Sequence, residues 1–378
     1  MQKKILLLSR DPGGANAILP MIAPLARRGY DIALFGKDAA LKRYREEGLV
    51  GLDVNDYMNA ADPRAIDMFL SNTRPDAILT GTSADDMTEK YIWKAAEASG
   101  IPSFALVDQW VNYGIRFSRY GLADMEMYYK HKNHEFLPTA IFATDADAKR
   151  EMEQDGLPGS RISVTGNPYF EYFLGQASRV TANELNSMKN DLGIHEDDHV
   201  VTFISEPIAK MYGAQSYLGY TETTIVREVI EALLLIKNET SKRILLIIRL
   251  HPKDAEHHYD DCISDYSDML EIRTDRSMRS YESILLSDVV CGMYSMMLLE
   301  SLLLKKPLMS VQIGLTRENP FILARKGAIK TILNKDELVH EFRKVLMTGG
   351  NTLSGGFLFV EHPIENVITE IERHVCPN

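Results

Sequence analysis

Two aspartates stand directly after apolar runs in the first half of the chain. Asp11 follows Ile5–Leu8, and Asp108 follows Phe104–Val107. A carboxylate at the end of a buried strand is well placed to act as a general acid or base, although Asp11 also fits a helix cap. Both aspartates are therefore candidate catalytic residues that would deprotonate a hydroxyl group.

Small and aromatic residues accompany these two acids. Gly13 and Gly14 follow Asp11, where they let a helix N-terminus approach a ligand or merely form a tight strand–helix turn. Trp110 follows Asp108, and its flat face suits a sugar ring or a base unless the loop simply packs under the next helix. We expect these residues to bind a ligand such as a sugar.

A second group of candidates follows an apolar run in the second half of the chain. Arg249, His251 and Lys253 can all carry positive charge, which favours an anionic ligand such as a diphosphate over a solvated strand end. Ser295 is placed as a helix N-cap behind which free N–H groups could hold a phosphate. Glu300 lies in the same apolar helix, where it would bind a ligand hydroxyl or pair structurally.

The elements that must position these residues alternate between strands and helices. Such alternation predicts parallel sheets covered on both faces. The pattern breaks near residues 170–195 and then restarts. We therefore predict an α/β fold with two Rossmann-like parallel-sheet domains, 1–172 and 173–378, facing a central cleft. The last predicted helix, Pro363–His374, could instead pack back on the first domain.

Composition narrows the function classes. The 378 residues are 45% apolar and 25% charged, which is ordinary for a globular protein and excludes a disordered chain or a coiled coil. Lys and Arg number 42 against 53 Asp and Glu, a net charge of −11 that argues against nucleic-acid binding. No apolar run approaches the roughly 20 residues that span a bilayer. The chain has neither a metal-ligand signature nor a cofactor motif, so we expect no metal and no cofactor.

The three cysteines, Cys262, Cys291 and Cys376, are too far apart for a zinc motif or a disulfide framework. The apolar run at the start of the chain ends after Leu8, which is too early for a signal peptide. We expect a cytoplasmic protein, with the inner face of the membrane as the alternative location.

Several short motifs resemble the GT-B superfamily, which includes nucleotide-sugar glycosyltransferases and hydrolysing UDP-N-acetylglucosamine 2-epimerases. Gly81-Thr82-Ser83 through Asp108 to Arg116 is similar to the epimerase segment from Gly-Asp-Thr to Glu-Ala-Gly-Leu-Arg. Val164-Thr165-Gly166-Asn167 is similar to their Val-Thr-Gly-Asn. His251-Pro252 with Ser295 also resembles a pair that holds the donor nucleotide in bacterial sialyltransferases and related transferases. The resemblance implies the GT-B fold and, for Arg116, a role in sugar or acceptor binding.

Departures from the epimerase pattern favour a different reaction. The acidic motif position holds Thr82-Ser83, the glutamate position holds Asp108, and His-Arg-x-Glu-Asn is reduced to Ser205-Glu206-Pro207. We therefore expect a metal-independent glycosyltransferase of surface glycan or polysaccharide biosynthesis. A UDP-N-acetylhexosamine 2-epimerase or hydrolase and a non-catalytic sugar-nucleotide-binding or scaffold protein are the alternatives.

The expected partners follow from this resemblance. They are a CMP-, CDP- or UDP-linked sugar and a hydroxyl acceptor such as a glycan or a lipid-linked glycan. Peripheral membrane contact and a homodimer are further expectations.

Overall fold

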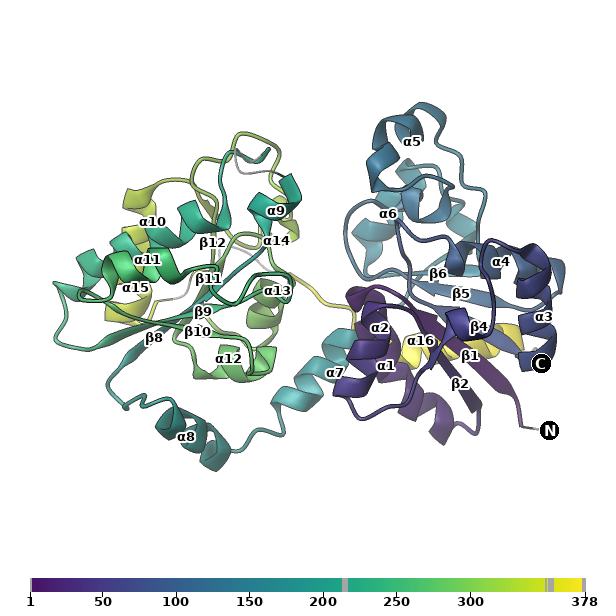
Figure 1. Ribbon diagram of the computed structural model, residues 1–378, viewed down its shortest axis with the longest axis horizontal. Helices are drawn as coiled ribbons and strands as arrows, with labels where there is room; N and C mark the ends of the chain where they lie inside the picture. Colours follow the sequence, from purple (N-terminus) through teal and green to yellow (C-terminus); the bar gives the residue numbers. More distant parts are fainter. Residues whose placement is uncertain (1, 213–216, 351, 353–356, 376–378) are drawn as a thin grey trace. The chain divides into compact units, whose positions relative to one another are not determined.

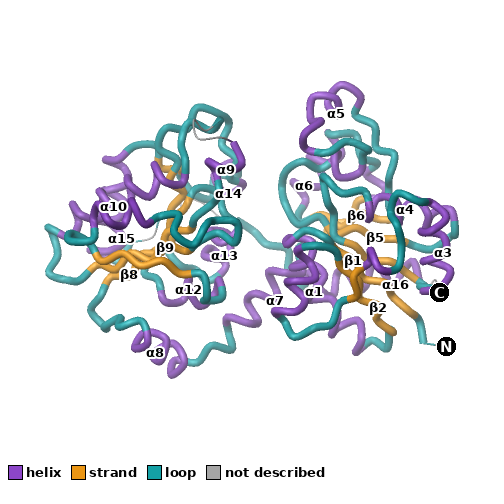
Figure 2. The backbone as a smooth tube through the Cα atoms, in the orientation of Figure 1, coloured by secondary structure: helices purple, strands orange, loops and turns teal. Residues whose placement is uncertain are grey.

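The computed structural model describes residues 2–212, 217–350, 352 and 357–375. The chain divides into two compact units, Met1–Tyr172 with Phe359–Asn378, and Phe173–Leu358. Each unit is an α/β domain built on one parallel sheet with helices on its faces (Figures 1 and 2), which confirms the predicted fold class. The predicted cleft between the domains stays a prediction.

The described residues of the first unit form a sheet of seven parallel strands in the order β3-β2-β1-β4-β5-β6-β7. Its strands are β1 (Lys4–Ser9), β2 (Asp31–Gly36), β3 (Leu52–Asp53), β4 (Ala77–Thr80), β5 (Ser103–Leu106), β6 (Ala140–Ala143) and β7 (Ile162–Val164). Its helices are α1 (Pro12–Arg27), α2 (Ala39–Glu46), α3 (Pro63–Thr73), α4 (Thr88–Ala98), α5 (Met125–His131), α6 (Ala146–Gln154) and α16 (Pro363–Val375).

Strand β1 shows why this sheet is covered on both faces. Side chains alternate across a strand, and all four residues Ile5–Leu8 are buried. Ile5 and Leu7 pack with α1 and α16, whereas Leu6 and Leu8 pack with α3 and α4. A continuous apolar run is thus the signature of a central strand between two helical layers.

The described residues of the second unit form a sheet of six parallel strands in the order β10-β9-β8-β11-β12-β13. Its strands are β8 (His199–Ile204), β9 (Ile244–Arg249), β10 (Glu271–Asp275), β11 (Val289–Gly292), β12 (Leu308–Val311) and β13 (Thr331–Ile332). The helices are α7 (Pro168–Ala177), which carries the boundary between the units, α8 (Ala182–Asp191), α9 (Ile208–Tyr212), α10 (Glu222–Lys237), α11 (Asp260–Tyr266), α12 (Ser280–Leu286), α13 (Met296–Leu303), α14 (Ile322–Arg325) and α15 (Lys335–Thr348).

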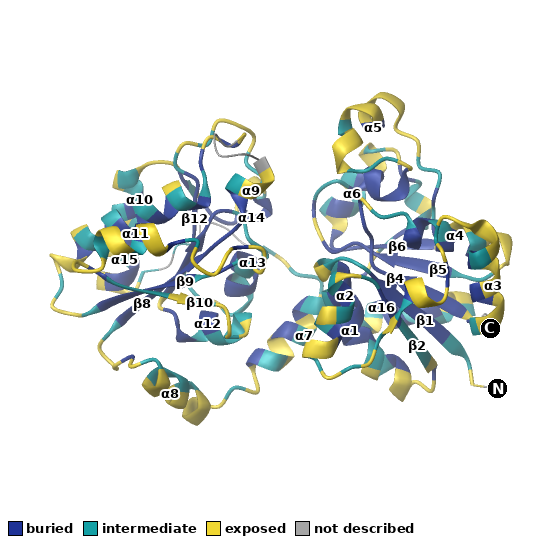
Figure 3. Ribbon diagram, in the orientation of Figure 1, coloured by how far each residue is buried: buried dark blue, intermediate teal, exposed yellow. Residues whose placement is uncertain are grey.

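The core of the second unit follows the same alternation. Val201 and Phe203 of β8 pack with α10 and α15, while Val200 packs with Ile194 on the opposite face. Helix α8 contributes no buried residue and is largely exposed (Figure 3). The strand ends of this unit are therefore held between two packed layers.

In both sheets the strand order reverses at one point, between β1 and β4 and between β8 and β11. Loops that leave the carboxyl ends of two such strands diverge to opposite faces, and ligands of open α/β sheets bind in the space between them. The loops after these four strands are therefore the places to look for chemistry.

Two further predictions concern the cysteines and the membrane. Cys262 and Cys291 are buried and free, and Cys376 lies outside the described residues. Within the described ranges, no helix has both the length and the apolar character needed to cross a bilayer.

Candidate functional site

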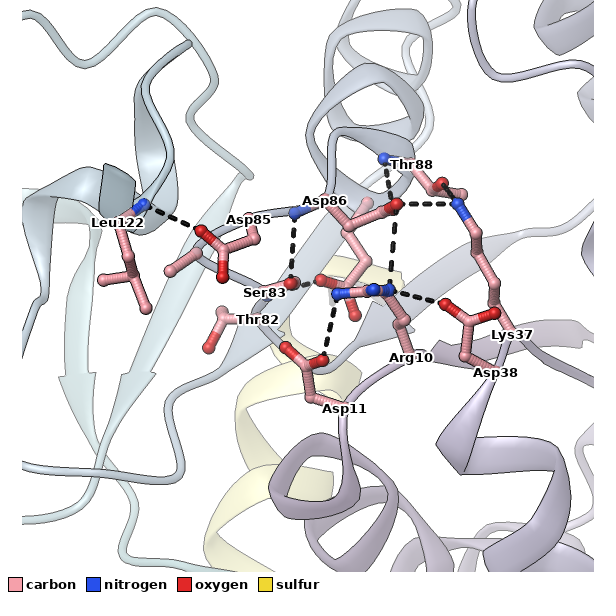
Figure 4. Close-up of polar contacts among 12 residues, drawn as sticks. Arg10, Asp11, Lys37, Asp38, Thr82, Ser83, Asp85, Asp86, Thr88 and Leu122 are labelled. Carbon is pink, nitrogen blue, oxygen red and sulfur yellow. Dashed lines mark hydrogen bonds and ion pairs between the residues drawn. The ribbon is translucent and has the colours of Figure 1, made fainter. Parts of the chain in front are cut away.

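Asp11 lies at the carboxyl end of β1 and takes the N-cap position of α1. Its side chain makes no capping hydrogen bond, and Arg10 Nη1 donates to its Oδ1 at 3.2 Å (Figure 4). The side chain is 40% exposed. The carboxylate is therefore accessible to a bound molecule, because it does not cap the N–H groups at the start of α1.

Asp108 lies against the same turn but in different surroundings. A Cβ at Gly13 would fall 1.7 Å from Asp108 Oδ2, so only glycine leaves room for this carboxylate. A Cβ at Gly14 would lie 3.2 Å from the Cα of Gly81 in the loop after β4. The two glycines thus let the loops after β1, β4 and β5 converge, and they enclose Asp108, whose side chain is 6% exposed.

Arg116, in the loop after β5, contacts both Asp108 and the loop after β4. Its Nη1 donates to Asp108 Oδ1 at 3.2 Å, to Thr82 O at 2.8 Å and to Thr82 Oγ1 at 2.9 Å. Burial raises the pKa of Asp108, and the guanidinium of Arg116 partly counteracts that rise. Arg116 Nε is buried and makes no hydrogen bond within the described residues. The structure thus brings Asp108, Arg116, Gly13 and Gly14 together.

Glu89, which the sequence analysis did not select, belongs to the same site. It lies in the first turn of α4 and accepts the Ser83 N–H at 2.7 Å. Burial, together with the nearby charge of Asp11, raises its pKa to about 8. The sequence signal for Glu89 was an acidic residue in the first helical turn after Gly81-Thr82-Ser83. That signal does not distinguish a site residue from an ordinary acidic residue that stabilises the helix dipole.

Arg10 connects Asp11 to a cluster of charged side chains. Arg10 Nε donates to Asp38 at 2.8 Å and lies 3.8 Å from Asp86, which in turn accepts from Lys37 Nζ at 2.6 Å (Figure 4). The Arg10 side chain thereby links the loops after β1, β2 and β4. Burial alone would raise the pKa of Asp86, but its hydrogen bonds from Lys37 and Thr88 hold that pKa below its usual value.

Trp110 is placed by packing. Its indole Nε1 donates to Asp145 at 2.6 Å, and its ring stacks on Phe170 with 6.1 Å between centroids. Only 5% of the residue is exposed. A sugar-stacking role for Trp110 stays a prediction, and the contacts describe a loop anchor.

In the second unit, Arg249 is the last residue of β9, and His251 lies in the loop that follows it. The Arg249 guanidinium is paired with Asp275 at the end of the neighbouring strand β10. The Lys253 N–H donates to His251 Nδ1 at 3.1 Å, and the His251 N–H donates to Asp254 at 2.8 Å. A neutral imidazole that accepts at Nδ1 carries its proton on Nε2, which can donate to a ligand.

Cations gather around His251. Burial lowers the pKa of its imidazole, the charge of Asp254 opposes that effect, and Lys253, Arg276 and Lys210 lower the pKa further. Lys210 Nζ donates to Lys253 O at 3.3 Å, and Arg276 donates to Asp254 O at 2.8 Å. Lys210 comes from α9 and Arg276 from the loop after β10, both distant in the sequence from His251, so spacing could not have revealed them.

The loop after β11 meets the loop after β8. Ser295 caps α13 by accepting the Met297 N–H at 3.3 Å, as predicted from the sequence. Glu206 accepts the Tyr294 N–H at 2.8 Å. Burial raises the pKa of Glu206 to about 8, although hydrogen bonds from backbone N–H groups of the loop lower it. The Glu206 carboxylate thus lies beside the N-cap of α13, next to the helix start where the sequence analysis placed a phosphate.

The remaining predicted contact, Glu300, is a buried residue of α13. No group of three or more His, Cys, Asp or Glu side chains within the described ranges is arranged to hold a metal ion.

The sequence matches no family model and no curated protein. Its fold is similar to that of a UDP-GlcNAc 2-epimerase from Neisseria meningitidis bound to UDP-GlcNAc, with TM-score 0.67 and 15% identity over 99% of this chain and 100% of that one. A UDP-GlcNAc 2-epimerase from Methanocaldococcus jannaschii is similar with TM-score 0.67 and 16% identity over 97% of this chain and 99% of that one. A glycosyltransferase from Rickettsia africae is similar with TM-score 0.61 and 12% identity over 100% of this chain and 99% of that one. At these identities the similarity establishes the fold, and the chain has the predicted GT-B fold.

Proposed function

We propose that this chain is a glycosyltransferase that moves a sugar from a nucleotide-sugar donor to a hydroxyl acceptor without a metal ion. The observation that carries the proposal is that one sheet ends in an accessible carboxylate and the other in an imidazole with cations around it. A reachable carboxylate, Asp11, stands at the end of β1, and a cation-surrounded imidazole, His251, stands at the end of β9. Transfer needs a base for the acceptor and positive charge for the departing phosphate.

The donor phosphates would bind at the end of β9. The Nε2–H of His251 would donate to a phosphate oxygen, and Lys210, Lys253 and Arg276 would neutralise the charge that develops on it. Arg249 would add its guanidinium beside Asp275. The start of α13 at Ser295 would supply further donors to the phosphates, and Glu300 would accept a hydrogen bond from a ribose or sugar hydroxyl.

The acceptor would react at the end of β1. Asp11 would take the proton of the attacking hydroxyl while the hydroxyl oxygen bonds to the anomeric carbon of the donor sugar. The bond between that carbon and the phosphate oxygen breaks, and the nucleotide leaves with the electron pair. Gly13 and Gly14 would let the acceptor approach this turn, and Arg116 would hold Asp108 beside it.

A 2-epimerase or hydrolase acting on a UDP-N-acetylhexosamine is the second candidate. The buried carboxyl groups of Asp108 and Glu89, both with raised pKa, favour it, since such groups suit proton transfer at a sugar carbon. Thr82 argues against it. This residue occupies the acidic position of the epimerase pattern and accepts two hydrogen bonds from Arg116 instead of supplying a carboxylate.

Three neighbouring structures connect this fold with uridine nucleotides. The Neisseria protein is bound to UDP-GlcNAc, and Anabaena HepE has been solved with UDP and with UDP-glucose. UDP-linked sugars are therefore the first donors to test, followed by CMP- and CDP-linked sugars. We further propose a cytoplasmic role in surface glycan or polysaccharide synthesis, with a glycan or a lipid-linked glycan as acceptor.

Incubation with each donor, with and without an acceptor mixture, separates the candidates. Release of free nucleotide that depends on an acceptor supports transfer. Conversion of UDP-GlcNAc to the manno sugar without an acceptor would replace the transferase proposal with the epimerase. Tight donor binding with no turnover in either condition would identify a sugar-nucleotide-binding or scaffold protein.

A further inference from the structure

A cavity of about 580 Å³ lies in the first unit at the carboxyl end of its sheet. Loops after β2, β3 and β4, together with the start of α4, supply its wall: Lys37, Asn55, Met58, Asn59, Ala60, Ala61, Asp85, Asp86, Met87, Thr88 and Tyr91. Sites for small molecules typically enclose about 300–1,000 Å³. The cavity is therefore large enough for a small ligand.

The wall offers hydrogen bonds of both kinds beside apolar surface. Asn59 Oδ1 accepts the Ala61 N–H at 3.0 Å, which fixes the side chain and leaves its amide N–H groups for a ligand. Asn55 adds a second amide. Tyr91, whose ring meets Phe136 edge-on at 5.6 Å between centroids, adds an amphipathic ring. Paired donors and acceptors next to apolar patches suit a molecule with several hydroxyl groups.

The charges of the wall discriminate against anions. Lys37 is already paired with Asp86 at 2.6 Å, which neutralises this cation of the wall. Asp85 uses one carboxylate oxygen to accept the Leu122 N–H at 2.7 Å and keeps its negative charge. A carboxylate or phosphate on the ligand would meet this charge while the lysine of the wall, Lys37, is already paired with Asp86, and desolvating the anion there would be costly.

The cavity lies one side chain away from Asp11. Arg10 contacts Asp11 at 3.2 Å and lies 3.8 Å from Asp86, which is part of the wall (Figure 4). Asp11 is not itself a wall residue, but it contacts the same Arg10 side chain that approaches the wall at Asp86. This juxtaposition connects the cavity with the proposed base.

We propose that this cavity binds the acceptor, and that the acceptor is a neutral, hydroxyl-rich sugar instead of a sialylated or phosphorylated one. The inference rests on the proposed function only where it identifies the bound sugar as the acceptor of the transfer reaction. The binding site itself does not depend on it, because sugar binding can be measured without any donor.

Ligand-observed NMR titration tests the site directly. Neutral methyl hexosides and N-acetylhexosaminides should bind the full-length chain, and sialic acid and hexose 6-phosphate should bind at least tenfold more weakly. Ala61→Trp, which fills the cavity while keeping the Ala61 N–H bond, should weaken neutral-sugar binding at least tenfold. Equal or tighter binding of the anionic sugars, or unchanged binding by the tryptophan variant, would overturn the proposal.

A gentler variant guards against misfolding. Asn55→Ala removes one amide of the wall, and Asn72→Ala removes an asparagine that is exposed on α3 outside the cavity. Neutral-sugar binding should fall several-fold in the first and stay unchanged in the second, and equal binding by both would contradict the site. Neutral-sugar binding by a chain that turns over no donor would refute the proposed function and leave the cavity assignment standing.

Discussion

At the scale of single residues, burial distinguishes two aspartates that the sequence presents alike. Asp11 and Asp108 both follow buried strands, yet their side chains are 40% and 6% exposed. Gly13 makes the difference, because a side chain there would occupy the space of the Asp108 carboxylate. A bound hydroxyl can reach Asp11, whereas Asp108 is held by Arg116. We therefore assign the proposed base to Asp11.

Replacing Asp11 by asparagine tests this assignment. Asp11→Asn keeps an oxygen that accepts from Arg10 but cannot take a proton, so the rate of acceptor-dependent transfer should fall roughly 10²–10⁴-fold. Asp38→Asn is the matched control, since Asp38 also pairs with Arg10. Steady-state nucleotide release measures both. A loss shared equally by the two variants would assign the effect to the Arg10 cluster instead of to a base.

Replacing His251 by alanine tests the phosphate site. A hydrogen bond to a charged group contributes about 1.5–3 kcal/mol, so His251→Ala should raise the Kd for the donor nucleotide roughly 10- to 150-fold. His257→Ala is the control, because His257 is an exposed neighbour that pairs with Asp260. Calorimetric titration with UDP, CMP and CDP gives the Kd values. An unchanged Kd for every nucleotide that binds would remove His251 from the site.

At the scale of elements, the start of α4 fastens the loop after β4. Lys90 Nζ donates to Ala84 O at 3.1 Å and to Ile115 O at 3.3 Å, and Glu89 accepts the Ser83 N–H. Burial lowers the pKa of Lys90 to about 8 and raises that of Glu89 to about 8. Two adjacent helical residues thereby join the loops after β4 and β5, beside the reversal of strand order between β1 and β4.

The buried carboxyl of Glu89 makes stability depend on pH. Its pKa rises from 4.5 to about 8 on folding, so the folded chain holds an extra proton between these values and stability falls as pH rises through this window. Glu89→Gln keeps the acceptor for Ser83 and cannot ionise. Its free energy of unfolding, from denaturant titrations at pH 5–9, should decline less with pH than that of the parent chain. Identical pH profiles would show that Glu89 keeps its ordinary pKa.

At the scale of the whole molecule, the last helix belongs to the first unit. Val367, Ile368 and Ile371 of α16 are buried with α1 and the first sheet. Arg28 of the first unit also forms an ion pair with Glu372 at 3.2 Å. The first unit therefore depends on a segment that follows the entire second unit in the sequence.

Truncating one side chain of α16 tests this dependence. Ile371→Ala should lower the stability of the first unit by about 2–5 kcal/mol, because it leaves a cavity in that core. Thr369→Ala, on the same helix and outside that core cluster, should change stability by less than about 0.5 kcal/mol. Calorimetry combined with limited proteolysis would show which unit unfolds first. Earlier unfolding of the second unit in Ile371→Ala would contradict the packing.

Patterns of local sequence predicted much of this protein because local physics governs them. Continuous apolar runs such as Ile5–Leu8 indicated parallel strands, and the position of Ser295 before an apolar stretch indicated its N-cap. Strands β3 and β13, of two residues each, cannot be predicted in this way because so short a run has no readable period. Strand β10 (Glu271–Asp275) cannot be predicted from an apolar run because its composition is polar.

The sequence alone determined the α/β class, the two parallel sheets and the acids and cations at their strand ends. Only the tertiary structure decided which of those groups a ligand can reach. It enclosed Asp108, paired Arg249 with Asp275, and surrounded His251 with Lys210 and Arg276. The reason is that strand and helix periods are local properties of the chain. Burial, pairing and pKa are set by residues that packing brings together from distant parts of the sequence.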